Sequence, residues 1–229
     1  MDLAFLWSIM PRLLEGAWVT LAILSQSVIY GLMLAIPLAL MRVSERTVLW
    51  APAYAYIFFF RGSPLLVQIF LIYYGLGQFD LVRDSILWPL LREGYWCAIL
   101  ALALNTAGYT AEILRGAIQA VPRGEVEAAR ALGMPWPLVL RRIVLPKAFR
   151  IALPAYVNEI IFLLKGSAVV FTVTVVDLMG AANLIRARTF RVYEPLLAAG
   201  AIYIILVFIL TRLLMVVERR INRHRLAPQ

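Results

Sequence analysis

Five long apolar runs, separated by polar and basic segments, decide what this chain can fold into. The runs cover about residues 13–40, 51–77, 96–118, 151–176 and 196–217. A membrane-spanning helix needs about 20 mainly apolar residues, and each run reaches that length. We expect helices because the runs lack the alternation of barrel strands, and because unpaired backbone groups in lipid are costly.

Composition supports a membrane protein. Hydrophobic residues make up 63% of the chain and charged residues 15%, with a mean hydropathy of +0.84. A soluble domain has about 45–50% apolar and about 25% charged residues. We therefore predict an all-α integral membrane protein with five transmembrane helices, forming one domain over residues 1–229. The mixed stretch 79–92 is expected to lie at a membrane interface.

The basic residues predict the orientation. One set of loops and ends holds 13 of them: Arg42, Arg46, Arg115, Arg123, Arg130, Arg141, Arg142, Lys147, Arg150, Arg219, Arg220, Arg223 and Arg225. The opposite set holds six: Arg12, Arg83, Arg92, Arg186, Arg188 and Arg191. The positive-inside rule places the larger set in the cytoplasm, so the N-terminus is expected outside and the C-terminus inside. Segment 177–194 runs against this rule, because its three arginines fall on the outer side.

A cytoplasmic helix–turn–helix is predicted over residues 119–147. Pro122 and Gly124 interrupt the third span, and the helix formers of 125–132 follow. Gly133 suits a helix end with positive φ. Pro135 or Pro137 opens a second helix, and Pro146 is expected to stop it. On physical grounds alone, this segment is either an ordinary surface hairpin or a docking element for a partner.

A family resemblance favours the docking element. The spacing Glu127-Ala128-Ala129, three residues, Gly133, nine residues, Ile143-x-Leu145-Pro146 resembles the EAA loop of importer-type ABC transporter permeases. The stretches 60–68, 105–124 and 152–161 resemble the polar amino-acid importers, in particular the M-type permeases for histidine, lysine, arginine and ornithine, and those for the opines octopine and nopaline. The resemblance covers roughly residues 13–220.

The resemblance implies a subunit of the bacterial inner membrane that pairs with a homologous Q-type permease. Two ATPase subunits and a periplasmic substrate-binding protein complete such an importer. The coupling element corresponds here to Glu127, Ala128, Ala129 and Gly133. The chain has no Gly-x-x-x-x-Gly-Lys-Ser/Thr loop, so it is not expected to hydrolyse ATP or to hold a cofactor. ATP and Mg would be bound by the partner ATPase.

Ionisable and amide side chains inside the runs are candidates for the substrate pathway, since such groups are expensive in lipid. Arg61 either faces a cavity as a cation or pairs with a carboxylate. Asn105, Tyr109 and Glu112 share one helical face. We assign Asn105 to the pathway and Glu112 to packing or charge pairing.

The fourth run carries Asn158, Glu159 and Lys165. Asn158 and Lys165 share a face, and Glu159 points about 100° away from Asn158. Glu159 is the candidate partner of a cationic substrate, because a buried carboxylate needs a positive partner. Lys165 would favour an opine, which has an additional carboxylate, or it pairs with an acid on the other permease.

Two other classes of protein remain as alternatives. A secondary amino-acid transporter driven by an ion gradient would need internal repeats, which are not visible, and would leave the 119–147 loop unexplained. A membrane enzyme would need a nucleophile–base pair or a metal site. Cys97 is the only cysteine and His224 the only histidine, so no metal site is expected.

Overall fold

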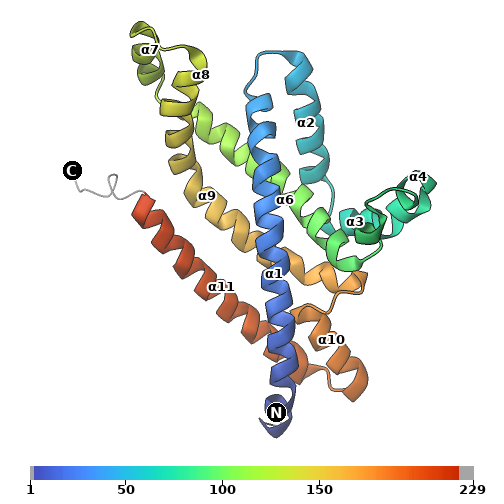
Figure 1. The fold of residues 1–229 in the computed structure, drawn as a ribbon. Coiled ribbons are helices and arrows are strands. Elements are labelled where there is room, and N and C mark those ends of the chain that lie inside the picture. Colours follow the sequence, from blue (N-terminus) through green and yellow to red (C-terminus); the bar gives the residue numbers. More distant parts are fainter. Residues whose placement is uncertain (1–2, 222–229) are drawn as a thin grey trace.

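The computed structural model describes residues 3–221, which are helical throughout their regular segments (Figure 1). Residues Arg223, His224 and Arg225 of the predicted basic tail lie outside this range. The elements in chain order are α1 (Leu3–Arg42), α2 (Thr47–Gly62), α3 (Leu65–Phe70), η1 (Leu71–Gly75), η2 (Leu76–Gln78), α4 (Asp80–Arg83), α5 (Trp88–Leu91), α6 (Gly94–Gln119), α7 (Arg123–Ala131), α8 (Trp136–Val139), η3 (Leu140–Val144), α9 (Leu145–Gly166), η4 (Ser167–Val173), α10 (Leu178–Thr189) and α11 (Tyr193–Ile221).

Within residues 3–221, four helices are long and apolar enough to cross a membrane, and a broken pair can supply the fifth span. The first, α1, has 40 residues and is longer than predicted. At 1.5 Å per residue it extends about 60 Å, twice the thickness of a bilayer core of about 30 Å. Figure 1 shows it running through most of the height of the molecule, with α10 beside its N-terminal part and α7 near the opposite end of the molecule.

The second predicted span, 51–77, is not one straight helix. It divides after Gly62, and α2 meets the segment Leu65–Gln78 at a bend of 107°. Pro64 occupies the break, as its missing N–H and its fixed φ favour. The chain therefore turns sideways into α3, and the stretch 79–92 forms the short helices α4 and α5 beyond it (Figure 1).

The prediction that Pro146 stops the loop helix is wrong. The chain stays helical from Trp136 to Val173, through α8, η3, α9 and η4. The segment η3 is a π-helix, in which the Leu145 N–H bonds to the Leu140 carbonyl. This wider turn directly precedes Pro146 and removes the need for the proline to donate an i→i−4 bond.

A helix not anticipated from the sequence, α10, fills the segment between the fourth and fifth spans. The Asp177 side chain caps it by accepting a 2.8 Å hydrogen bond from the Gly180 N–H. Its first turn packs against α1: the Leu178 N–H donates to the Thr20 hydroxyl at 3.1 Å. A Cβ added at Gly16 would lie 2.7 Å from the Asp177 carbonyl oxygen, so glycine permits this close approach.

The centre of the bundle is α6, which packs against α1, α2 and α9. Its buried face is dominated by small residues: Ala98, Ala101, Ala103, Ala107, Gly108 and Ala111. Small side chains allow neighbouring backbones to approach closely, which is how membrane helices gain packing energy. The polar residues of α6 are thereby held next to α2 on one side and α9 on the other.

Candidate functional site

In the 119–147 loop, α7 is followed by a turn and then by α8, which continues into η3 and α9. Pro122 precedes α7, and Gly133 follows it with a φ of +78°, which a residue with a side chain would adopt only with strain. Glu127 and Ala128 are exposed on α7. Ala129 is instead 4% exposed, and its small side chain packs within this chain.

The loop has a small core of its own. Ala129 packs with Ala117, Val139 and Val144, which come from α6, α8 and η3. Glu125 of α7 forms an ion pair with Lys147 of α9. These contacts fix α7 to the base of the fourth span.

Glu112 on α6 gathers three arginines. Arg115 lies 2.9 Å from its carboxylate, Arg42 3.3 Å and Arg61 3.9 Å. The prediction that Glu112 serves in charge pairing is confirmed, and Arg61 has the carboxylate partner that one of its two interpretations required. The Arg61 side chain is still 44% exposed and lines a cavity of about 410 Å³ with Glu112 and Tyr109. Arg61 therefore satisfies both interpretations in part.

Asn105 joins α6 to the break between α2 and α3. In an unbroken helix the Phe60 carbonyl would accept from residue 64, but proline has no N–H to donate. Gln68 and Asn105 supply the missing donors at 2.9 and 3.2 Å, and Asn105 also donates to Gln68 at 3.0 Å. Our sequence analysis missed Gln68. The carbonyl left free by Pro64 is the signal that could have pointed to an amide nearby.

A second cavity, of about 440 Å³, lies between α6 and α9. Asn105, Tyr109 and Glu159 line it, together with Phe162 and other apolar residues. Glu159 is 9% exposed and accepts a 3.0 Å hydrogen bond from the Thr106 hydroxyl. Within residues 3–221 no cation forms an ion pair with this carboxylate. The structure thus brings two predicted pathway residues, Asn105 and Glu159, to the lining of one cavity. Tyr109 belongs to this cavity and to the one lined by Arg61.

Asn158 and Lys165 lie elsewhere. Both are exposed on one face of α9, as their spacing predicted, and neither lines the cavity of Glu159. The Lys165 Nζ lies 5.8 Å from the ring centroid of Phe162, which does line it. Lys165 is therefore at the rim of the enclosure, on a surface that this chain leaves open.

Comparison with known proteins agrees with this architecture. Residues 27–223 match the family described as "Binding-protein-dependent transport system inner membrane component". The octopine transport system permease protein OccM of Rhizobium radiobacter is 50% identical over 99% of this chain and 95% of its own length. The histidine/lysine/arginine/ornithine transport system permease protein HisM of Salmonella typhimurium is 41% identical over 91% of this chain and 89% of its own length.

A solved structure matches with a TM-score of 0.85 and 35% identity, covering 96% of this chain and 99% of that chain. It is the crystal structure of an amino acid ABC transporter with histidines. The secondary-transporter interpretation gains no support from any of these matches. By its family match and its spanning helices, this chain belongs to the inner membrane components of binding-protein-dependent transport systems, and it is a multi-pass permease subunit of an ABC importer.

Proposed function

We propose that this permease carries a cationic amino acid or an opine through the cavity between α6 and α9. The observation that carries the proposal is the buried carboxylate of Glu159, which has no cationic partner among the described residues and faces a cavity of about 440 Å³. Ligand pockets for small molecules fall in the range of about 300–1,000 Å³. A guanidinium, imidazolium or ammonium side chain of the substrate would supply the missing charge.

Arg61 complements Glu159. Arg61 lines the neighbouring cavity, and Tyr109 lines both that cavity and the one of Glu159. An amino acid carries a carboxylate as well as its cationic side chain. We assign the substrate carboxylate to the Arg61 side of Tyr109 and the cationic side chain to Glu159.

Lys165 is the residue that would distinguish an opine from a plain amino acid. It lies at the cavity rim beside Phe162 and is exposed, so it is free to meet a second carboxylate. The octopine permease OccM and the histidine, lysine, arginine and ornithine permease HisM are both similar to this chain. Octopine or nopaline is therefore the substrate that we place first, because it uses both Glu159 and Lys165. Asn158 lies on the same open face of α9, where the homologous permease would pack.

The 119–147 loop is proposed as the coupling element. Exposed Glu127 and Ala128 would contact the ATPase subunit. Ala129 and Gly133 would maintain the conformation of the 119–147 loop. The core would contain this chain and a homologous Q-type permease, with two ATPase subunits and a periplasmic binding protein. ATP and Mg would be held by the ATPase alone. The N-terminus would lie in the periplasm, and the loop and the C-terminus in the cytoplasm.

Uptake by the complete importer in proteoliposomes tests both parts of the proposal. Labelled octopine, nopaline, arginine, lysine and histidine would be compared, with ATP inside the liposomes. For the coupling element, Glu127→Lys is matched by Glu45→Lys, the same charge reversal at an exposed acid between α1 and α2. Glu127→Lys should abolish ATP-dependent uptake, and Glu45→Lys should leave it near the wild-type rate. Full uptake with Glu127→Lys would overturn the coupling role.

For the substrate, Lys165→Ala should lower octopine uptake at least about tenfold relative to arginine uptake, since a charge-assisted hydrogen bond is worth roughly 1.5–3 kcal/mol. An unchanged preference between octopine and arginine would mean that Lys165 pairs with the other permease. Measurable uptake of any of the five substrates would in that case still support the assignment of the substrate class to the cavity of Glu159. Transport of none of them would refute the substrate class.

A further inference from the structure

Three arginines of the segment between the fourth and fifth spans contradict the positive-inside rule, and transport does not explain them. The structure accounts for two of them. Arg186 donates to the Asn183 side chain at 3.0 and 2.7 Å, and Arg191 lies 4.4 Å from the ring centroid of Phe5. Arg188 is exposed and forms no ion pair within residues 3–221. Its charge is therefore available for a ligand.

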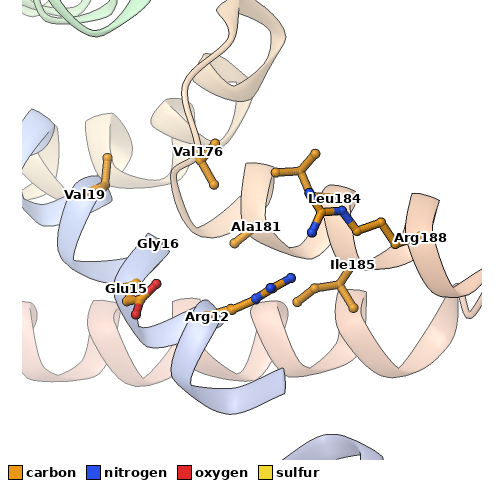
Figure 2. A pocket seen from close by; sticks show the side chains of 9 residues that line it. All are labelled: Arg12, Glu15, Gly16, Val19, Val176, Ala181, Leu184, Ile185 and Arg188. Atoms are coloured by element: carbon orange, nitrogen blue, oxygen red, sulfur yellow. The ribbon is translucent and has the colours of Figure 1, made fainter. Parts of the chain in front are cut away.

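Arg188 shares a cavity with Arg12. The cavity has a volume of about 400 Å³ and lies between α10 and α1. Figure 2 shows that both side chains extend into this space from opposite helices. Arg12 also has no ion pair in the described part of the chain. Two neighbouring guanidinium groups repel each other unless an anion lies between them, and their planar donors match the oxygens of a phosphate.

The remaining walls of this cavity indicate what the anion is attached to. Val19, Val176, Leu184 and Ile185 provide an apolar lining next to the two arginines. A free inorganic ion would gain nothing from such walls, whereas the upper part of an acyl chain would bury apolar surface on them. Glu15 lines the α1 side of the cavity and forms no ion pair within residues 3–221. Its carboxylate suits a head group that carries an ammonium as well as a phosphate.

The position of the cavity along α1 also fits a lipid. Arg12 directly precedes the first apolar run, which begins at Leu13. Trp7 and Trp18 lie on either side of Arg12 on α1, with 77% and 73% of their surface exposed. Tryptophan gathers where the hydrocarbon meets the head groups. The two arginines are thus at the depth of a lipid phosphate. Helix α10, which carries Arg188, lies at the opposite end of the molecule from α7 (Figure 1).

We propose that the cavity between α1 and α10 is a binding site for a phospholipid. Arg12 and Arg188 hold the phosphate, Glu15 faces the ammonium of an ethanolamine head group, and the apolar walls hold the start of an acyl chain. Such a lipid would join α10 to α1 and would explain why arginines are kept on this side of the membrane. The site is separate from the cavity of Glu159 and does not depend on the proposed substrate.

The test measures how much phospholipid stays bound to the complete importer after the importer has been purified in mild detergent. Native mass spectrometry would count the lipids per assembled complex for the wild type, for Arg12→Gln with Arg188→Gln, and for Arg186→Gln. The last variant removes an equal charge from the same segment, but at a residue already bonded to Asn183. Short-chain phosphatidylethanolamine, short-chain phosphatidylglycerol and inorganic phosphate would then be titrated onto delipidated complex.

We expect the double variant to bind phosphatidylethanolamine at least about tenfold more weakly, as the loss of two charge-assisted contacts implies. Arg186→Gln should bind it like the wild type, and Glu15→Gln should reduce the preference for phosphatidylethanolamine over phosphatidylglycerol. If the double variant does not assemble, each single variant should still bind phosphatidylethanolamine more weakly than the wild type, by a smaller factor than that expected for the double variant. Equal lipid retention in all variants would overturn the proposal. So would binding of inorganic phosphate as tightly as lipid, or a defect confined to docking of the periplasmic binding protein.

Discussion

The Thr106 hydroxyl of α6 donates a 3.0 Å hydrogen bond to the Glu159 carboxylate of α9, and both residues are buried. This bond joins α6 to α9, the two helices that supply most of the lining of the proposed substrate cavity. It also orients the carboxylate without neutralising it, because a hydroxyl carries no charge. The position of the Glu159 carboxylate is therefore set by this chain, and no ion pair within residues 3–221 neutralises it.

Glu159→Gln should weaken transport of a cationic substrate more than Thr106→Val does. The glutamine keeps the shape and can still accept from Thr106, but it loses the charge. Loss of an ionic contact costs roughly 1.5–3 kcal/mol, so KM should rise about tenfold or more. Thr106→Val keeps the charge and should change KM by only a few-fold. Initial uptake rates against substrate concentration give both values, and equal effects of the two variants would contradict the role of the charge.

The break between α2 and α3 yields a prediction about stability. Gln68→Leu leaves the Phe60 and Ser63 carbonyls without the amide that now donates to them at 2.9 and 3.1 Å. The Phe60 carbonyl keeps its bond from Asn105, but the Ser63 carbonyl loses its amide donor and the Asn105 amide loses its acceptor on Gln68. The free energy of unfolding of the assembled importer should therefore fall by about 2 kcal/mol. Gln78→Leu is the matched control, because Gln78 is exposed and makes only a local 3.3 Å bond to Tyr74. Thermal unfolding in detergent should show a lower Tm for Gln68→Leu alone.

These sites show how far the sequence could predict the structure. The spans follow from apolar runs, because lipid leaves a backbone few other options. The form of the 119–147 loop follows from Pro122 and Gly133, because each of them acts on the backbone in its immediate neighbourhood. The 107° break does not follow, since proline alone permits either a kink or a turn. The choice depends on Gln68 and Asn105, which meet only after α2, α3 and α6 have packed together.

Helix α10 was missed for a related reason. Its sequence is not apolar enough for a span, and Arg186 and Arg188 indicated a polar loop. The helix is stabilised by the Asp177 cap and by contact with Thr20 of α1, which lies 158 residues before Leu178 in the chain. Continuity through Pro146 was missed because the π-turn of η3 cannot be read from composition.

The contact between α1 and the start of α10 predicts that Gly16 does not tolerate a side chain. A Cβ there would lie 2.7 Å from the Asp177 carbonyl oxygen and 2.9 Å from the Leu178 Cα, and backbone atoms cannot rotate away. Gly16→Ala should therefore destabilise the importer by about 1–3 kcal/mol. Gly116→Ala should be neutral or slightly stabilising, because a Cβ on Gly116 of α6 has no neighbour within 4 Å and alanine favours helix. A comparison of their Tm values checks this, and equal values would refute it.

Asp177 predicts a pH dependence of stability. It lies between η4 and α10, outside the spanning helices, and is 1% exposed. Burial raises the pKa of its carboxyl group from 3.8 to about 6, although hydrogen bonds from the Gly180 and Met179 N–H groups act in the opposite direction. The Tyr203 hydroxyl of α11 is the side chain that faces it across the interface. The folded protein therefore binds this proton more tightly than the unfolded chain does.

Between pH 4 and pH 6 the unfolded chain has lost the proton that the folded protein keeps, so stability should fall as the pH rises through this window. Because the pKa is about 6 in the folded protein and 3.8 in the unfolded chain, Asp177 contributes about 3 kcal/mol to the free energy of unfolding at low pH. This contribution is lost once the pH exceeds about 6. Asp177→Asn keeps an oxygen to cap Gly180 but has no proton to release. Its Tm should match the wild type near pH 4 and exceed it near pH 7, whereas exposed Asp84→Asn should follow the wild type at both. A difference that does not grow with pH would mean that Asp177 is not the titrating group.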